Sequence, residues 1–162
     1  MPRECSVADA LAVLGARWAL LALREVFLGV RRFDEIQANT GAPRSVLTRR
    51  LVMLVEADVL ERRTYQDQGE RQRAEYVLTD AGRELQPVIT ALMQWGDAHI
   101  ADRPPLAVTH RDCGAPVRAV LTCSAGHRLD DTGRDLLATQ TDETCTPSPA
   151  PTSPAPSMSK EL

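Results

Sequence analysis

Two histidines and two cysteines in the C-terminal third of the chain have the residue types and the spacing of a metal site. They follow the pattern His110-x2-Cys113-x9-Cys123-x3-His127, which places four ligands within 18 residues. Zinc is commonly held by a tetrahedron of thiolates and imidazoles, and it can stabilise a segment too short to build its own core. The pattern predicts either a zinc site or a small hairpin without metal, and no other cofactor is suggested.

Residue patterns that support catalysis are missing at recognisable spacings. The triplet His110-Arg111-Asp112 matches part of the kinase catalytic loop, but the glycine-rich loop and the DFG motif that should accompany it are lacking. No Ser/His/Asp, Cys/His or phosphate-loop arrangement stands out either. The sequence therefore predicts a protein that is not an enzyme.

Arginines are concentrated in two stretches of a chain whose formal net charge is -3. Residues 31–50 hold five arginines against two acidic residues, and residues 62–73 hold four against two. Guanidinium groups suit phosphates and guanine edges because they donate several hydrogen bonds in a fixed plane. The distribution of charge, rather than its sum, favours a nucleic-acid-binding protein.

Hydrophobic periodicity predicts a mainly α (α+β) domain that would position these arginines. Helices are expected over residues 6–14, 17–28, 33–40, 43–57 and about 80–100, with a hairpin from strands 60–66 and 75–79. Pro87 predicts a kink or a later start in the last helix. The two helices joined by NTGAP form a helix-turn-helix, and the hairpin behind them forms a wing.

Two further segments follow the predicted winged helix of residues 5–103. Residues 104–143 should form a small appendage with short strands in LAVTH and VRAVLTC, and residues 144–162, rich in Pro, Ser and Thr, should be disordered. The first 30 residues do not resemble a signal peptide, and no apolar run reaches ~20 residues, the length of a membrane span. We expect a cytoplasmic protein without a membrane partner.

The helix that begins at Pro43 separates an apolar face from a small polar face. The apolar face carries three leucines, Leu47, Leu51 and Leu54. The opposite face is mixed polar and apolar, with Ser45, Thr48, Arg49 and Val52. A helix that enters the major groove of DNA needs such a face. A solvated surface would be the simpler interpretation of an isolated helix, but the helix-turn-helix and the wing arginines favour DNA.

Four motifs occur in the order and spacing of one family: LGARWALLALREVFLGVRRFDEIQ, VLTRRLVMLVEADVLERRTYQ, AEYVLTDAGREL and ALMQWGD. Over residues 5–103 the chain resembles the HxlR family of winged helix-turn-helix transcriptional regulators, which are related to the MarR type. The resemblance implies a homodimer that binds double-stranded DNA at an inverted-repeat operator, without catalysis.

The resemblance also assigns roles to individual residues. Residues 43–57 would be the recognition helix and residues 67–73 the wing. The implied contacts to bases and phosphates come from seven residues: Arg44, Ser45, Thr48, Arg49, Arg50, Arg71 and Arg73. The first and last helices would form the dimer, through Leu11, Leu14, Leu92 and Trp95, which are also candidates for the core alone.

Two positions bear on how far the resemblance extends. Asp58 stands where the family usually has glycine, and because aspartate tolerates the left-handed conformation, we expect the turn to be kept. Cys5 stands where some members sense oxidants, and it is either such a sensor or an inert thiol near a helix start. An alternative function is therefore a sensor of an oxidant or a small molecule, with the winged helix chiefly a dimer scaffold.

Overall fold

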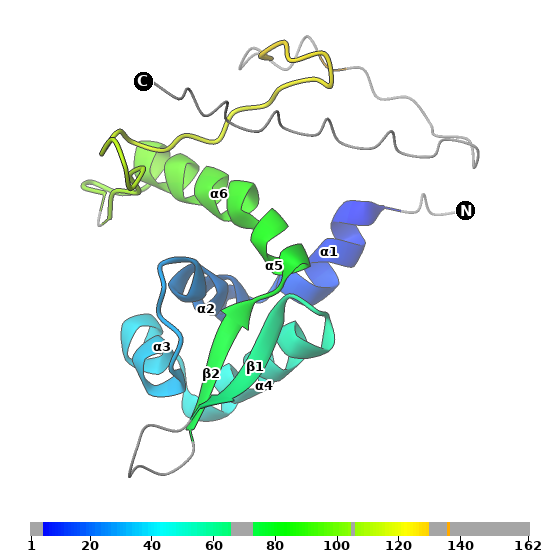
Figure 1. Ribbon diagram of the computed structural model, residues 1–162, viewed down its shortest axis with the longest axis vertical. Helices are drawn as coiled ribbons and strands as arrows, with labels where there is room; N and C mark the ends of the chain where they lie inside the picture. The colour runs from blue at the N-terminus through cyan, green and yellow to red at the C-terminus, as the bar shows by residue number, and fades with distance from the viewer. Residues whose placement is uncertain (1–4, 66–72, 105, 130–135, 137–162) are drawn as a thin grey trace, which may run out of the picture. The chain divides into compact units, whose positions relative to one another are not determined.

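The computed structural model describes residues 5–65, 73–104, 106–129 and 136 (Figure 1). The elements are α1 (Ser6–Leu14), α2 (Arg17–Phe27), α3 (Phe33–Thr40), α4 (Arg44–Glu56), β1 (Leu60–Tyr65), β2 (Arg73–Leu78), α5 (Asp80–Glu84) and α6 (Gln86–His99). This order confirms the predicted mainly helical winged helix-turn-helix.

The core of the winged helix forms where α2, α3, α4 and the start of β1 meet. Six large side chains are less than 2% exposed there: Leu23, Ile36, Leu47, Leu51, Leu54 and Leu60. Burying a leucine or isoleucine side chain contributes about 1.5–3 kcal/mol, so this cluster is a main source of stability. It also fixes the orientation of α4, because three of the six residues come from its apolar face.

The turn between α3 and α4 is determined by local hydrogen bonds. Gly41 ends α3 in the left-handed conformation, with φ of +69°. The Thr40 hydroxyl donates to the Ile36 carbonyl over 2.7 Å and accepts from the Ala42 amide over 3.3 Å. Pro43 then precedes the first helical residue of α4, and Ala42 is buried. The sequence NTGAP therefore specifies a tight helix-turn-helix corner.

The hairpin of β1 and β2 is antiparallel, with Leu60 paired with Leu78 and Tyr65 with Arg73. A short third pairing extends it, since the Tyr76 amide donates to the Arg31 carbonyl over 2.9 Å and Arg32 forms a bridge with Glu75. The prediction placed Arg73 in the wing loop, and this was wrong. Arg73 is the first residue of β2, because pairing begins two residues earlier than the alternating pattern suggested.

The region predicted to be helical over about residues 80–100, with a kink or a later start at Pro87, forms two helices. The Thr79 side chain caps α5 by accepting a hydrogen bond from the Gly82 amide over 2.9 Å. The helical conformation is interrupted at Leu85, and α6 begins at the next residue. Pro87 lies in the first turn of α6, where its missing N–H costs nothing. The interruption just before Pro87 agrees with the predicted kink or later start.

The C-terminal part contains no strand among its described residues, so the strands predicted in LAVTH and VRAVLTC were wrong. Isolated bridges join Thr109 to Pro116 and Thr122 to Arg128 instead. By contact density the chain divides into two compact units, residues 1–119 and 120–162. The predicted disordered tail, residues 144–162, lies outside the described residues.

No single helix within the described ranges is long and apolar enough to cross a bilayer. The pair α1 and α2 would reach the required length and composition only together, and the two helices are bent by 80° at their junction.

Candidate nucleic-acid interface

Helix α4 has the two faces that its sequence predicts. Its leucines are fully buried, whereas three residues of the opposite face, Ser45, Thr48 and Arg49, are exposed. The Thr48 hydroxyl donates to the Arg44 carbonyl over 2.9 Å, so its oxygen lone pairs and its methyl group stay available to a ligand. Short side chains in the first half of α4 would let its backbone approach a groove closely.

Arg44, the first residue of α4, is held by two side chains of α3. Its guanidinium lies 4.7 Å from the ring centre of Phe33, and Nη1 lies 3.3 Å from Oδ1 of Asp34. The ion pair is exposed, with 69% of the arginine and 86% of the aspartate side chain accessible. An exposed ion pair of this kind contributes only about 0–1 kcal/mol to the stability of the fold. A phosphate can therefore replace Asp34 as the partner of Arg44.

The next two arginines of α4 differ in their surroundings. Arg49 is exposed and makes no hydrogen bond or ion pair with any residue that the structure describes. Arg50 is half-buried: Nη1 lies 3.2 Å from Sδ of Met53, and Nε is buried without a hydrogen-bond partner in the described part of the chain. Arg49 is thus available to a ligand, whereas Arg50 lies along the side of the helix.

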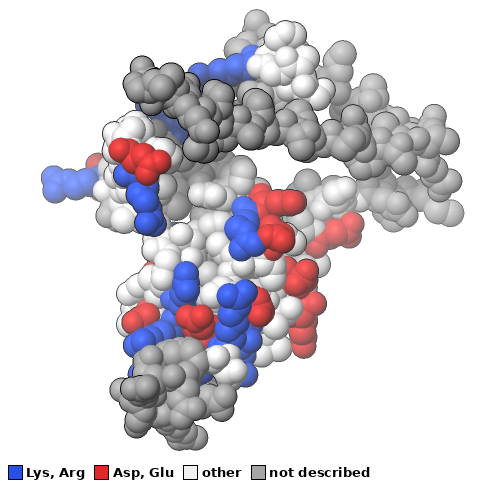
Figure 2. Space-filling model, viewed as in Figure 1, with Lys and Arg blue, Asp and Glu red and all other residues white. Residues whose placement is uncertain are grey.

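A hollow of about 620 Å³ lies beside α4, between the start of α3 and the hairpin. Four arginines line it, Arg32, Arg44, Arg62 and Arg73, together with the acidic residues Asp34 and Glu35. Figure 2 shows basic side chains gathered on this part of the surface. The local excess of positive charge favours an anion such as a backbone phosphate.

Two of these arginines, Arg32 and Arg62, were not among the residues predicted to contact DNA. Both fall within the arginine-rich stretches, so the local charge could have identified them as candidates. Their proximity to Arg44 could not be inferred, because it depends on the bridge between Arg32 and Glu75 and on the register of the hairpin.

Other arginines of the hairpin region are paired with carboxylates. Nη2 of Arg63 lies 2.8 Å from Oε2 of Glu61, and this hydrogen bond lowers the pKa of the Glu61 carboxyl. Nη1 of Arg31 lies 4.0 Å from Oε2 of Glu75. These pairs reduce the charge that the strands offer to a ligand. Arg71, predicted in the wing loop, lies outside the described residues.

A buried carboxylate, which the sequence did not reveal, joins α2 to the helix-turn-helix. Glu25 is 3% exposed, and its Oε2 accepts a hydrogen bond from Nδ2 of Asn39 over 2.8 Å. Nε of Arg24 donates to Oε1 of the same carboxylate over 3.0 Å. Glu25 therefore has both oxygens partnered, and it fixes the end of α3 against α2.

The residues predicted for the dimer interface are placed in two environments. Leu11 of α1 and Leu92 and Trp95 of α6 are 55%, 50% and 59% exposed. Leu14 is 8% exposed and belongs to the core cluster. Exposed apolar side chains of this size are the type that a partner surface covers.

Cys5 and the C-terminal cysteines and histidines are largely accessible. Cys5 is exposed at the N-terminal end of α1. Nδ1 of His110 lies 3.4 Å from Sγ of Cys113, and within the second unit the Cys123 amide donates to the His127 carbonyl over 3.0 Å. Over the described ranges no group of three or more His, Cys, Asp or Glu residues is close enough to hold a metal ion. Zinc binding by the four residues stays a prediction.

Comparison with known proteins agrees with this architecture. An HTH-type transcriptional regulator of Mycobacterium tuberculosis is 46% identical over 121 residues, which are 74% of this chain and 75% of the relative. The crystal structure of PA1607, a candidate transcription factor, superposes with a TM-score of 0.74 at 31% identity and covers 86% of this chain and 97% of its own.

A second solved structure, the redox regulator HypR in its reduced form, superposes with a TM-score of 0.51 at 25% identity. It covers 58% of this chain and 92% of its own length. Residues 13–104 match the model of the family described as HxlR-like helix-turn-helix. The fold, the exposed face of α4, the family match and these relatives lead to one conclusion. The chain belongs to the HxlR-like helix-turn-helix family and is a transcriptional regulator of the helix-turn-helix type.

Proposed function

We propose that this regulator binds operator DNA with α4 in the major groove. The observation that carries the proposal is the division of α4, whose leucines are 0% exposed while Ser45, Thr48 and Arg49 are exposed on the opposite side. Arg49 is the candidate for a base contact, because it has no partner among the described residues. Ser45 and Thr48 are small enough to allow a close approach.

The phosphate contacts are proposed for the arginine-lined hollow beside α4. Arg44 and Arg73 were predicted to contact DNA, and the hollow adds Arg32 and Arg62. The wing, with Arg71, would reach the flanking minor groove or backbone. Arg50 is a weaker candidate than its neighbour, since its guanidinium lies against Met53.

The active form is proposed to be a homodimer on an inverted repeat. Exposed Leu11, Leu92 and Trp95 supply apolar area on the two helices that would meet at the two-fold axis. Two recognition helices related by this axis require half-sites separated by about one helical turn, ~34 Å.

Selection of bound fragments from a random DNA library tests the proposal in one experiment. The expected product is a palindromic motif with half-sites 10–11 base pairs apart, roughly the repeat of B-DNA. Recovery of unrelated sequences, or of a single half-site without symmetry, would contradict the operator and the dimer respectively.

A second function, sensing of oxidants through Cys5, is favoured by one observation: the thiol is exposed at the start of α1, next to the proposed dimer surface. A solved structure of similar fold is that of a redox regulator. Mass spectrometry of the full chain after mild peroxide treatment tests this function. An unmodified Cys5 would remove its support.

A further inference from the structure

A second concave site lies on the far side of α6 from the proposed dimer surface. Residues Thr90, Met93, Gln94 and Asp97 follow the spacing i, i+3, i+4, i+7 and share one face of α6. Val88, Leu92 and Trp95 share another. At 100° per residue the two faces point in opposite directions, so the site is independent of dimer contacts.

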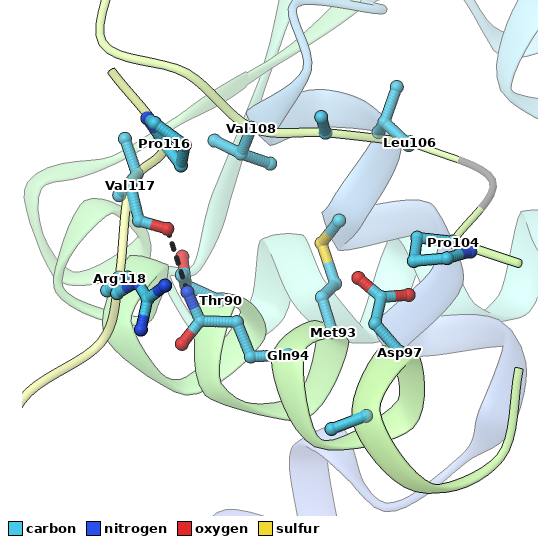
Figure 3. Close-up of a pocket in the computed structure, with 12 residues that line it drawn as sticks. Thr90, Met93, Gln94, Asp97, Pro104, Leu106, Val108, Pro116, Val117 and Arg118 are labelled. Atoms are coloured by element: carbon cyan, nitrogen blue, oxygen red, sulfur yellow. Dashed lines mark hydrogen bonds between the residues drawn. The ribbon is translucent and has the colours of Figure 1, made fainter.

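The segment of residues 106–119, here named the strap, covers the first of these faces (Figure 3). Its own backbone is joined where the Val117 amide donates to the Val108 carbonyl over 2.9 Å. The side chain of Gln94 fixes the strap to α6, since Nε2 donates to the Val117 carbonyl over 2.8 Å and Oε1 accepts from the Ala119 amide over 3.1 Å. Both polar ends of Gln94 are thereby used for positioning.

Between the strap and α6 lies a cavity of about 580 Å³. Its walls are mainly apolar, with Met93, Leu106, Val108 and Pro116 among the lining residues. This volume lies within the range of sites that hold small organic molecules, about 300–1,000 Å³. The walls favour a ligand with an apolar body.

One carboxylate enters this apolar cavity. Figure 3 shows the side chain of Asp97 directed into the space beside Met93 and Pro104. Asp97 is half-buried and has no hydrogen bond or ion pair with the described residues. A half-buried charge without a partner gains more from a counter-charge than an exposed charge does, because water solvates it less well.

The other charged lining residue, Arg118, lies near Thr90 at the opposite end of the cavity. It is exposed, so water already solvates its guanidinium. The unbalanced charge inside the cavity is therefore negative. We propose that the cavity between α6 and the strap binds a small apolar molecule with a protonated amine, whose charge pairs with Asp97.

Isothermal titration calorimetry of the full chain with three probes of equal apolar size tests the proposal. The probes are 4-phenylbutylamine, 4-phenylbutan-1-ol and 5-phenylpentanoate, which carry a positive, a neutral and a negative group on the same phenylbutyl body. The amine should bind about tenfold more tightly than the alcohol, because a charge-assisted hydrogen bond is stronger than a neutral one, and the carboxylate should bind most weakly.

Substitutions in the chain decide whether Asp97 is responsible. Asp97→Asn should lower the affinity for the amine about tenfold and leave that for the alcohol unchanged. Asp112→Asn, an exposed strap residue that does not line the cavity, should change neither. Val108→Trp, which fills the cavity, should remove binding of both, and its circular dichroism spectrum checks that it folds.

Four results would overturn the proposal: no binding of the amine at millimolar concentration, equal affinity for the three probes, tightest binding of the carboxylate, or full amine affinity in Asp97→Asn. Retained amine binding in a folded Val108→Trp variant would also overturn it. The titrations contain no DNA, so their outcome is independent of the proposed operator binding.

Discussion

The backbone of Gly82 in α5 lies directly against the carbonyl group of Val59, the residue before β1. A Cβ atom added at Gly82 would stand 2.0 Å from the Val59 oxygen and 3.1 Å from its carbonyl carbon. Both obstacles are backbone atoms, which cannot move aside as a flexible side chain would. This close approach joins the hairpin to the last two helices.

Gly82→Ala should therefore destabilise the protein although alanine is the better helix former. We expect a loss of about 1–3 kcal/mol in the free energy of unfolding, the usual cost of overpacking, measured by urea denaturation at fixed protein concentration.

Gly96→Ala in α6 is the matched control, because a Cβ there meets nothing within 4 Å. The control should gain about 0.5–1 kcal/mol from helix propensity. Equal effects at the two sites would show that the contact with Val59 does not constrain the fold.

Asp58 has a positive φ of 55° in the turn between α4 and β1. Asp58→Val should lower the free energy of unfolding by about 1–2 kcal/mol, since a β-branched side chain is strained in the left-handed region. Asp58→Gly should equal or exceed the wild type. Thermal melts followed by circular dichroism distinguish the two variants, and a Val variant as stable as the Gly variant would contradict the prediction.

If Arg49 hydrogen-bonds to a guanine, Arg49→Ala should relax the base preference of DNA binding. The substitution should also weaken the binding free energy for the selected operator by about 1–3 kcal/mol. A gel-shift titration on the operator and on single-base variants measures both effects. Arg17→Ala removes the same charge from exposed α2 surface and is the control. Equal operator binding by wild type and Arg49→Ala would exclude the base contact.

If Arg44 binds a phosphate as proposed, Asp34 would compete with DNA for it, because the two side chains form an exposed ion pair. Asp34→Asn should raise operator affinity severalfold at low salt, with a smaller gain at high salt, where surface charges are screened. Fluorescence anisotropy with a labelled operator at two salt concentrations measures the change. In an Arg44→Ala background the gain should be reduced, whereas an undiminished gain would mean that Asp34 acts without Arg44.

Glu25→Ala should destabilise the helix-turn-helix by about 1–3 kcal/mol, because it removes the charge-assisted hydrogen bond between the buried carboxylate and Asn39. Asn39→Ala tests the same hydrogen bond from α3. If the bond acts as a unit, the double variant should lose less than the sum of the two single losses in urea unfolding. Strict additivity would argue against a coupled pair.

The fold could be predicted from the sequence wherever one face of an element meets the core. The leucines of α4 recur at helical spacing, and all three are fully buried. The interruption of the last helix at Pro87 was predicted from one residue, and the left-handed turn at Asp58 was expected from the family resemblance, because glycine usually stands at that position. Such features are encoded within a few positions.

The remaining features depend on partners far apart along the chain. The early start of β2 at Arg73 and the bridge from Arg32 to Glu75 come from pairing between strands. The sequence did not identify Glu25 as a buried hydrogen-bonding residue, because it lies within the apolar run of α2 and its partner Asn39 is 14 positions away. Arg32 and Arg62 lie within the arginine-rich stretches, but only the folded hairpin brings them beside Arg44.

Helix α1 has nine residues, of which Leu14 alone is buried, whereas Val7 and Leu11 are 65% and 55% exposed. Isolated helices shorter than ~12–15 residues are marginal in water, so within one copy of the chain α1 depends on the packing of Leu14 and the half-buried Val13 against the core. In the proposed homodimer, a second subunit would cover these side chains. The N-terminal helix would then fold as the two copies associate. The amide hydrogens of α1 should therefore exchange more slowly as the protein concentration rises.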